Sequence, residues 1–239
     1  MYTVGVDEAG RGPVLGPLVV TACAIPKKDL GMLKDVGVKD SKDLSKKKRQ
    51  EILSWYHEQS ETRGWKHSVI VCTPERIDLS LQSTGLNWLE VEAFAEALSG
   101  LELEQHHDII NDACDVKPER FTERIRAKLQ QPQLEISTMS SFHKADENYP
   151  IVGMASILAK ETRDNLIDAM AQRIGQPLGS GYPSDPATVN ALQWLITDDG
   201  IDFDVRWGWA TSIRYWNAHC RGDIPLRGAS HSFQKTLFD

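Results

Sequence analysis

Two short apolar stretches open the chain: Tyr2-Thr3-Val4-Gly5-Val6-Asp7 and Leu18-Val19-Val20-Thr21-Ala22-Cys23-Ala24-Ile25. Both stretches are rich in valine and other apolar residues, and turn-forming residues stand beside them, so each predicts a strand. The glycines and prolines of residues 10–17 predict the turn between the two strands. Strands joined by so short a connection pair antiparallel. We therefore expect this pair to begin the central sheet of the protein.

The rest of the chain alternates between short apolar stretches and helical patterns. The predicted strands lie at residues 67–72, 108–112 and 134–138, and the predicted helices at 45–58, 86–101, 118–129 and 151–174. Because strands that alternate with helices pair in parallel, the sheet should be mixed. The sequence thus predicts an α/β fold, with a mixed five-stranded sheet flanked by helices.

The composition of the chain changes after residue 174, where glycine and proline become frequent. A helical pattern at 187–196 and a tryptophan-rich segment follow. We therefore expect a main domain at residues 1–175, and a small C-terminal helical lobe with a tail at residues 176–239.

The 239 residues include 27 Lys and Arg against 34 Asp and Glu, which gives a formal net charge of −7. This charge argues against a protein that holds nucleic acid by positive charge spread over its surface. The sequence has neither the apolar run of a membrane span nor the pattern of a signal peptide. Its four cysteines form no C-x-x-C pair, which argues against a disulfide framework and a zinc ribbon. Together these features predict a reducing, cytoplasmic compartment.

Two adjacent acids, Asp7 and Glu8, end the first predicted strand. Their mutual repulsion and desolvation are costly, so either they are solvated at the rim of the sheet or a divalent cation offsets their charge. Neighbouring strand residues point to opposite faces, so the two acids share a site only if the backbone leaves the strand at Glu8. Gly10 and Gly12 would make that departure easy.

Asp112 ends another predicted strand, and functional sites gather at the carboxyl ends of strands in α/β sheets. Its rival is Asp115, which could cap the following turn. Asp146, on a loop before the longest predicted helix, is the fourth candidate, although a loop aspartate is usually a turn former. Three or four acids without a histidine or cysteine cluster favour Mg²⁺ or Mn²⁺ over Zn²⁺. The adjacent His106 and His107 are expected in an exposed turn.

The turn of residues 10–16 contains glycines but is not a dinucleotide-binding fingerprint, because Leu15 occupies the position of the third glycine. A tight hairpin would explain the glycines but not Arg11, which could donate to a phosphate. Positive charge is also concentrated in residues 39–49, which include six basic residues and two acids. This segment is either a solvated helix face or a phosphate-binding surface.

Several motifs together resemble ribonuclease HII, in particular its archaeal branch. They are Gly5-Val6-Asp7-Glu8-Ala9-Gly10-Arg11-Gly12, Asp40-Ser41-Lys42, His143-Lys144-Ala145-Asp146, Ala155-Ser156-Ile157-Leu158-Ala159-Lys160, Arg163-Asp164 and Gly179-Ser180-Gly181-Tyr182-Pro183-Ser184-Asp185-Pro186. The resemblance implies an RNase H-like fold and an endonuclease that cuts the RNA strand of RNA–DNA hybrids and nicks 5′ of ribonucleotides embedded in duplex DNA. It also implies a site for Mg²⁺ or Mn²⁺, with two ions when substrate is bound, on Asp7, Glu8, Asp112 and Asp146.

The same resemblance assigns the substrate-binding residues. Gly10, Arg11 and Gly12 would read the 2′-hydroxyl, and Tyr182 would pack on the sugar at the RNA-to-DNA junction. Lys42 is the phosphate contact that the resemblance implies, and Lys144 is a further candidate for this role.

The resemblance further implies binding to a sliding clamp through the C-terminal tail, at Gln234, Leu237 and Phe238. We also expect a monomer. The chain ends before the aromatic pair of such clamp-binding peptides, so a frayed end is the alternative for this tail. Two other functions remain open for the whole chain. One is a DNA-directed nuclease of the same fold, and the other is a catalytically silent nucleic-acid-binding module.

Overall fold

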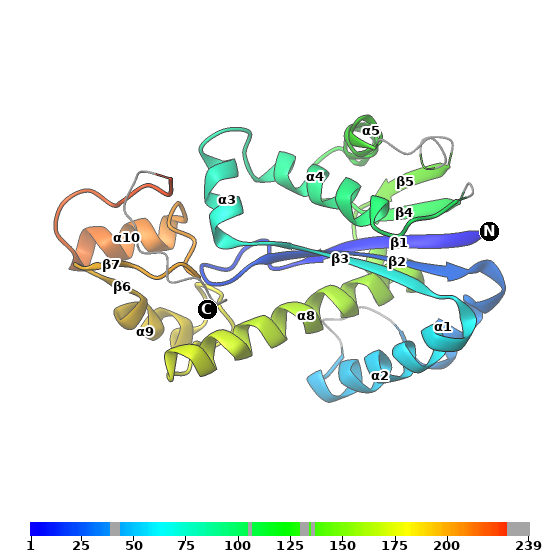
Figure 1. Ribbon diagram of the computed structural model, residues 1–239, viewed down its shortest axis with the longest axis horizontal. Coiled ribbons are helices and arrows are strands. Elements are labelled where there is room, and N and C mark those ends of the chain that lie inside the picture. Colours follow the sequence, from blue (N-terminus) through cyan, green and yellow to red (C-terminus); the bar gives the residue numbers. More distant parts are fainter. Residues whose placement is uncertain (39–43, 105–106, 130–133, 135–136, 229–239) are drawn as a thin grey trace.

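The computed structural model describes residues 1–38, 44–104, 107–129, 134 and 137–228. A mixed five-stranded sheet in the order β3-β2-β1-β4-β5 lies at its centre (Figure 1). The strands are β1 (Tyr2–Ala9), β2 (Leu18–Pro26), β3 (Lys66–Cys72), β4 (Asp108–Asp112) and β5 (Thr138–Phe142). β2 pairs antiparallel with both β1 and β3, whereas β4 pairs in parallel with β1 and β5. The predicted mixed sheet is therefore confirmed.

Helices cover both faces of this sheet, α4 and α5 on one face and α1, α2 and α8 on the other (Figure 1). The main-domain helices are η1 (Lys27–Asp29), α1 (Gly31–Asp35), α2 (Lys46–Arg63), α3 (Pro74–Leu81), α4 (Leu86–Ser99), α5 (Pro118–Lys128), α7 (Ala145–Asn148) and α8 (Pro150–Ile174). Among the residues that the structure describes, no helix is both long enough and apolar enough to cross a membrane.

Local capping explains where several helices begin. The Ser45 side chain accepts a hydrogen bond from the Lys48 N–H (3.2 Å) at the start of α2. Thr73 caps α3 in the same way, and Pro74 occupies its first turn. α3 was not predicted from the sequence, although this Thr-Pro pair is a recognisable start signal.

The fifth strand was predicted at residues 134–138 but lies at β5, four residues further on. Its sequence, Thr-Met-Ser-Ser-Phe, is more polar than the stretch before it because β5 is an edge strand whose side chains alternate between buried and exposed. Asp108 of β4 pairs with Thr138, so the neighbouring strand sets the position of β5. Because β5 lacks a continuous apolar run, the prediction was placed on the more apolar residues before it.

The expectation of an exposed turn before β4 is wrong for His107, whereas His106 lies outside the described residues. His107 is buried, and its Nδ1 accepts a hydrogen bond from the Tyr2 N–H (3.1 Å). The ring also packs edge-on against Tyr2, with 5.6 Å between the ring centroids. His107 therefore joins the start of β1 to the start of β4.

α8 crosses the sheet directly over Gly5 of β1. A Cβ atom at Gly5 would lie 2.4 Å from the Ile151 carbonyl oxygen, so only glycine allows the first turn of α8 to approach so closely. The short helix α7 directly precedes α8, and this contact brings it to the end of β1. Asp146 is thereby carried to the sheet edge where β1 ends.

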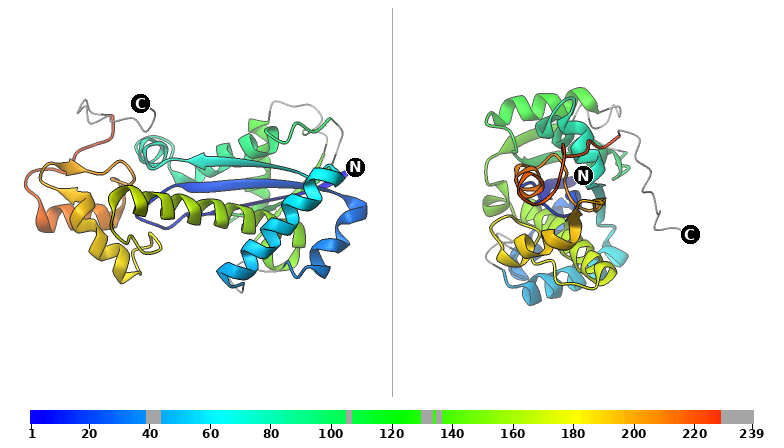
Figure 2. Two further views of the ribbon diagram at one scale, coloured as in Figure 1. Left: turned by 60° about the horizontal axis from the view of Figure 1, so that its bottom comes forward. Right: turned by 90° about the vertical axis from the view of Figure 1, so that its left-hand side faces the viewer.

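The C-terminal elements gather at one end of the molecule (Figure 2). They are α9 (Pro186–Leu195), β6 (Ile196–Thr197), β7 (Gly200–Ile201) and α10 (Ala210–His219), of which we predicted only α9. Their apolar side chains share one core with Val14 and Leu15 of the turn after β1, and with Ile167 and Met170 of α8. The lobe is therefore built around the glycine-containing turn. The division of the chain at residue 175 stays a prediction.

Candidate active site

Three acids meet at the carboxyl ends of β1 and β4. Asp7, Glu8 and Asp112 each place a carboxylate oxygen within 4.8 Å of the other two. The expected departure of the backbone at Glu8 is wrong, because β1 pairs with β2 as far as Ala9. The pairing with β4, however, extends only to Val6. Asp7 and Glu8 thus lie where β1 extends beyond β4, and both side chains can reach this edge.

Asp146 reaches the same edge from α7. It is buried, and its negative charge contributes to raising the pKa of Asp7. The neighbouring Ala145 N–H donates a hydrogen bond to the Asp112 carboxylate (2.6 Å), which ties the start of α7 to the end of β4. The structure thus brings the four predicted acids into one neighbourhood.

Asp115, the rival of Asp112, has structural partners instead. Its carboxylate pairs with Arg120 and with Arg124 (3.2 Å), and accepts a hydrogen bond from the Lys117 N–H (3.0 Å). The Arg120 hydrogen bond is the main cause that lowers the pKa of Asp115 to about 2. Asp115 therefore fixes the segment that leads into α5.

The clustered acids are under electrostatic strain. Burial raises the pKa of Asp7 well above its ordinary value, and the charges of Glu8 and Asp112 raise it further. Burial and Asp112 likewise raise the pKa of Glu8. A bound cation would offset this repulsion, and a donor set of carboxylate oxygens suits a hard divalent ion. The cluster fits a divalent metal.

The carbonyls of the glycine-containing turn are held by Arg206, which our sequence analysis missed. Its fully buried guanidinium donates from Nε to Gly16 (3.0 Å), from Nη1 to Arg11 (2.9 Å) and from Nη2 to Gly10 (2.5 Å). The guanidinium also stacks on Trp209, whose indole N–H donates to the Gly12 carbonyl (3.2 Å). Arg206 and Trp209 thus fix the backbone of the turn from the C-terminal lobe.

The side chain of Arg11 turns back onto the protein. It donates hydrogen bonds to the Cys114 carbonyl and to Asn87 Oδ1, both at 2.8 Å, and lies 3.3 Å from the Glu90 carboxylate. The side chain remains 40% exposed. A phosphate at Arg11 would therefore have to share the guanidinium with three partners in the protein.

Tyr182 lies beside the same turn. A Cβ atom at Gly12 would be 3.7 Å from Cε1 of the Tyr182 ring, and the Arg163 guanidinium stacks over that ring at 5.1 Å. Arg163 also donates to the Ser180 carbonyl (3.0 Å), which fixes the loop that carries Tyr182. Gly12 and the partly exposed Tyr182 are thus neighbours although 170 positions separate them.

The basic segment 39–49 offers less free positive charge than its sequence suggests. Arg49 is buried and pairs with Glu161 (2.6 Å) and Asp164 (3.0 Å). Lys46 pairs with Asp168 (3.0 Å), whereas Lys42 lies outside the described residues. Arg49 therefore joins α2 to α8 and does not face a substrate.

The remaining predicted residues are Lys144 and the three clamp-binding candidates of the C-terminal tail. Lys144 is exposed at the start of α7, and its ammonium group lies 2.8 Å from the Glu147 carboxylate. The clamp-binding candidates Gln234, Leu237 and Phe238 lie outside the described residues.

Glu90 is a buried acid that we did not predict. Burial and the charge of Glu8 raise its pKa to about 8, although Arg11 and Arg206 oppose the shift. A helical-wheel reading could have found Glu90, because α4 turns it toward the same buried side as Leu86 and Phe94.

This raised pKa predicts how the stability of the metal-free protein depends on pH. Between its ordinary pKa and about 8, Glu90 is protonated in the folded state and ionised in the unfolded state. Stability therefore falls as pH rises through this window, by up to about 1.4 kcal/mol per pH unit from this group. Glu90→Gln should be more stable than wild type at pH 8, and its melting temperature should drop less between pH 6 and pH 8.

Melting curves in the presence of a chelator would test this expectation. Glu92→Gln is the matched control, since Glu92 lies on the same helix but is partly exposed and pairs with Lys128 (2.8 Å). If the melting temperatures of wild type and Glu90→Gln fell equally between pH 6 and pH 8, the raised pKa of Glu90 would be contradicted.

Known proteins resemble the chain in both sequence and fold. The sequence model of the family described as Ribonuclease HII matches residues 4–212. A curated protein of that name from Methanococcus maripaludis (strain C6) is 44% identical over 211 residues, which cover 87% of this chain and 84% of that protein.

Two solved structures extend this similarity to the fold. The ribonuclease H2 from Pyrococcus horikoshii OT3 superposes with a TM-score of 0.78 at 38% identity, over 91% of this chain and 98% of that one. A chain in the structure of the PCNA:RNase HII complex from Archaeoglobus fulgidus gives a TM-score of 0.68 at 34% identity, over 80% of this chain and 85% of that one.

Proposed function

Since this chain belongs to the ribonuclease HII family and is a ribonuclease H, we propose that it is an endonuclease for RNA–DNA hybrids and for duplex DNA that contains ribonucleotides. It hydrolyses the RNA strand of the hybrid, nicks 5′ of an embedded ribonucleotide, and leaves a 3′-hydroxyl and a 5′-phosphate. The observation that supports this proposal most is the position of the acidic cluster, at the end of the strand that leads into the turn of residues 10–16.

In this proposal Asp7, Glu8, Asp112 and Asp146 hold the catalytic cations, Mg²⁺ or Mn²⁺, with two ions when substrate is bound. Ions held by these residues would supply activation of the attacking water and stabilisation of the leaving oxygen. The protein contributes preorganisation: β1 and β4 fix three of the carboxylates, and the Ala145 N–H orients Asp112.

Selection of RNA is assigned to the turn and to Tyr182. Gly10, Arg11 and Gly12 contact the 2′-hydroxyl, the group that distinguishes RNA from DNA, and Tyr182 packs against the sugar. The position of Tyr182 beside Gly12, and the fixation of the turn by Arg206, support this assignment. Lys42 and Lys144 are proposed phosphate contacts.

A cleavage assay tests the proposal with two duplexes, one that carries a single ribonucleotide and an identical all-DNA duplex, each with and without Mg²⁺ or Mn²⁺. We expect a nick 5′ of the ribonucleotide only when the metal is present. Equal cutting of the all-DNA duplex would favour a DNA-directed nuclease. No cleavage of either duplex with either metal would favour a silent binding module.

Tyr182→Ala should slow the cleavage of the duplex with one ribonucleotide by about tenfold to 100-fold, because the stacking surface for the sugar is lost. Tyr182→Phe keeps the ring and should retain most of the activity. The melting temperature should change little in Tyr182→Phe, which makes it the matched control. Equal activity of Tyr182→Ala and wild type would remove Tyr182 from the substrate site.

The C-terminal tail is a proposed clamp-binding peptide with Gln234, Leu237 and Phe238 as its anchors. The structure of a relative in complex with PCNA supports a clamp partner. A chain that lacks residues 234–239 should lose most of its affinity for a sliding clamp in a calorimetric titration, while its cleavage of free duplex should be unchanged. Equal affinity of the full and shortened chains would contradict the role of the tail.

We also propose that the enzyme is a cytoplasmic monomer. All four cysteines are free, which suits a reducing compartment.

A further inference from the structure

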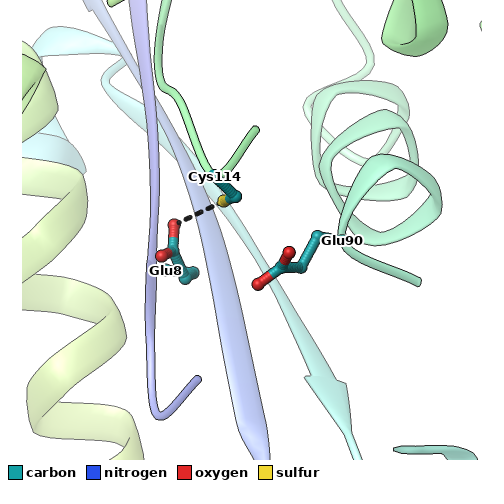
Figure 3. A group of neighbouring side chains, drawn as sticks. All are labelled: Glu8, Glu90 and Cys114. Atoms are coloured by element: carbon teal, nitrogen blue, oxygen red, sulfur yellow. Dashed lines mark hydrogen bonds between the residues drawn. The ribbon is translucent and has the colours of Figure 1, made fainter. Parts of the chain in front are cut away.

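A second group of possible metal ligands lies next to the four acids. Glu8 of β1, Glu90 of α4 and Cys114 of the segment after β4 each place one ligand atom within 4.8 Å of the other two (Figure 3). The Cys114 thiol donates a hydrogen bond to the Glu8 carboxylate, with 3.2 Å between sulfur and oxygen. Glu8 thus belongs to both groups.

Glu90 is the member that points to a ligand. Its side chain has no solvent exposure, and within the described part of the chain neither of its oxygens accepts a hydrogen bond. The carboxylate faces Glu8 and Cys114 (Figure 3). Its nearest cation is Arg11 at 3.3 Å, whose own hydrogen bonds go to Cys114 and Asn87. A buried carboxylate without hydrogen bonds is costly, so a cation at this position would be strongly stabilising.

We propose that Glu8, Glu90 and Cys114 form a second metal site, for a thiophilic divalent cation such as Zn²⁺. Thiolate sulfur selects such ions over Mg²⁺, and three protein ligands with one water suit tetrahedral zinc. In that geometry a sulfur and an oxygen ligand lie roughly 3.6 Å apart, close to the distance between Cys114 and Glu8. The ion replaces the thiol proton of Cys114 and the proton that Glu90 carries in the metal-free protein, and both protons pass to solvent as the bonds to the metal form.

The charges around this site also balance. One thiolate and two carboxylates carry three negative charges, and the divalent ion together with Arg11 supplies three positive ones. Arg11 contacts Glu90 through Oε2, which leaves Oε1 for the ion. Arg11 also holds the Cys114 carbonyl, so it fixes two of the three ligands from outside the coordination sphere.

The shared Glu8 gives this site a consequence for catalysis, which rests on the function proposed above. An ion bound by Glu90 and Cys114 draws Glu8 away from Asp7 and Asp112. Zinc should therefore inhibit the cleavage that Mg²⁺ supports, and Cys114 should determine the sensitivity to zinc.

Titration of the full-length protein with Co²⁺ tests the site without any assay of activity. A cobalt–thiolate bond produces a charge-transfer band in the near ultraviolet, which we expect to saturate at one ion per chain. Cys114→Ser and Cys114→Ala should both lose the band, and Glu90→Gln should weaken binding about tenfold or more. Cys220→Ser is the matched control and should keep the band, because Cys220 is a partly exposed cysteine outside the cluster. Absence of the band in wild type, or its persistence in both Cys114 variants, would overturn the site.

The inhibition is measured separately, with cleavage in Mg²⁺ normalised to the zinc-free rate of each variant. Cys114→Ser should need about tenfold more Zn²⁺ than wild type for half inhibition. Equal inhibition despite loss of the cobalt band would refute the competition through Glu8. If no duplex is cut but the band behaves as expected, the metal site stands and the proposed function fails.

Discussion

Asp7→Asn should lower the rate of cleavage by on the order of 10³-fold, which corresponds to about 4 kcal/mol of lost transition-state stabilisation. The amide keeps the volume of the carboxylate but supplies no negative charge for a cation. The folded state should not suffer, because burial and the charges of Glu8 and Asp112 already destabilise the ionised Asp7. In the presence of a chelator at pH 8, the variant should melt at or above the wild-type temperature.

The same variant should lose the stabilisation that Mg²⁺ or Mn²⁺ gives to the wild type, which melting curves with and without the metal would show. Asp115→Asn is the informative comparison. It breaks the pairs with Arg120 and Arg124 and should lower stability, yet the folded enzyme should keep its activity. Full activity in Asp7→Asn, or a larger loss of activity in Asp115→Asn, would show that the catalytic acids are wrongly assigned.

Arg206→Ala should cost about 3–5 kcal/mol of stability, because it leaves the buried carbonyls of Gly10, Arg11 and Gly16 without their shared donor. For a chain of this length, that loss corresponds to a melting temperature lower by roughly 10 °C. Within the described residues, Arg206 has no carboxylate among its hydrogen-bond partners, and burial lowers its pKa to about 9. Burial of the charged guanidinium is therefore unfavourable, and the three hydrogen bonds to the turn offset this cost.

Arg206→Lys tests the link to substrate choice, since it keeps the charge but cannot reach all three carbonyls. We expect it to fold and to cut the duplex with one ribonucleotide about tenfold more slowly, while its stabilisation by Mg²⁺ is unchanged. Arg173→Lys, at the end of α8, is the control, because Arg173 is partly exposed and pairs with Asp202 and Asp204 of the C-terminal lobe. If Arg206→Lys cut as fast as wild type, Arg206 would have a purely structural role.

Features that depend on neighbouring residues could be predicted from the sequence. The first two strands follow from their apolar composition, and the start of α2 follows from the Ser45 cap. The acids Asp7, Glu8 and Asp112 stood out because each ends or follows an apolar stretch. These signals are local, so they can be recognised in the sequence without knowledge of the distant contacts.

The missed features depend on contacts between distant parts of the chain. Arg206 is separated by at least 190 positions from the carbonyls that it holds, so no local pattern reveals their pairing. Arg49 looked like part of a solvated basic helix, yet its partners Glu161 and Asp164 lie on α8. Arg49 is therefore not part of the phosphate-binding surface that we expected at residues 39–49.

The long separation between Arg206 and the turn has a consequence for the order in which a newly made chain matures. Ribosomes release the N-terminal part first, and domains generally begin to fold in that order. The four acids have all been translated by residue 146, whereas the donor that fixes residues 10–16 is added only near the end. A nascent chain therefore acquires its acidic cluster before it can hold the turn in place. We expect the ability to tell RNA from DNA to be the last property that biosynthesis completes.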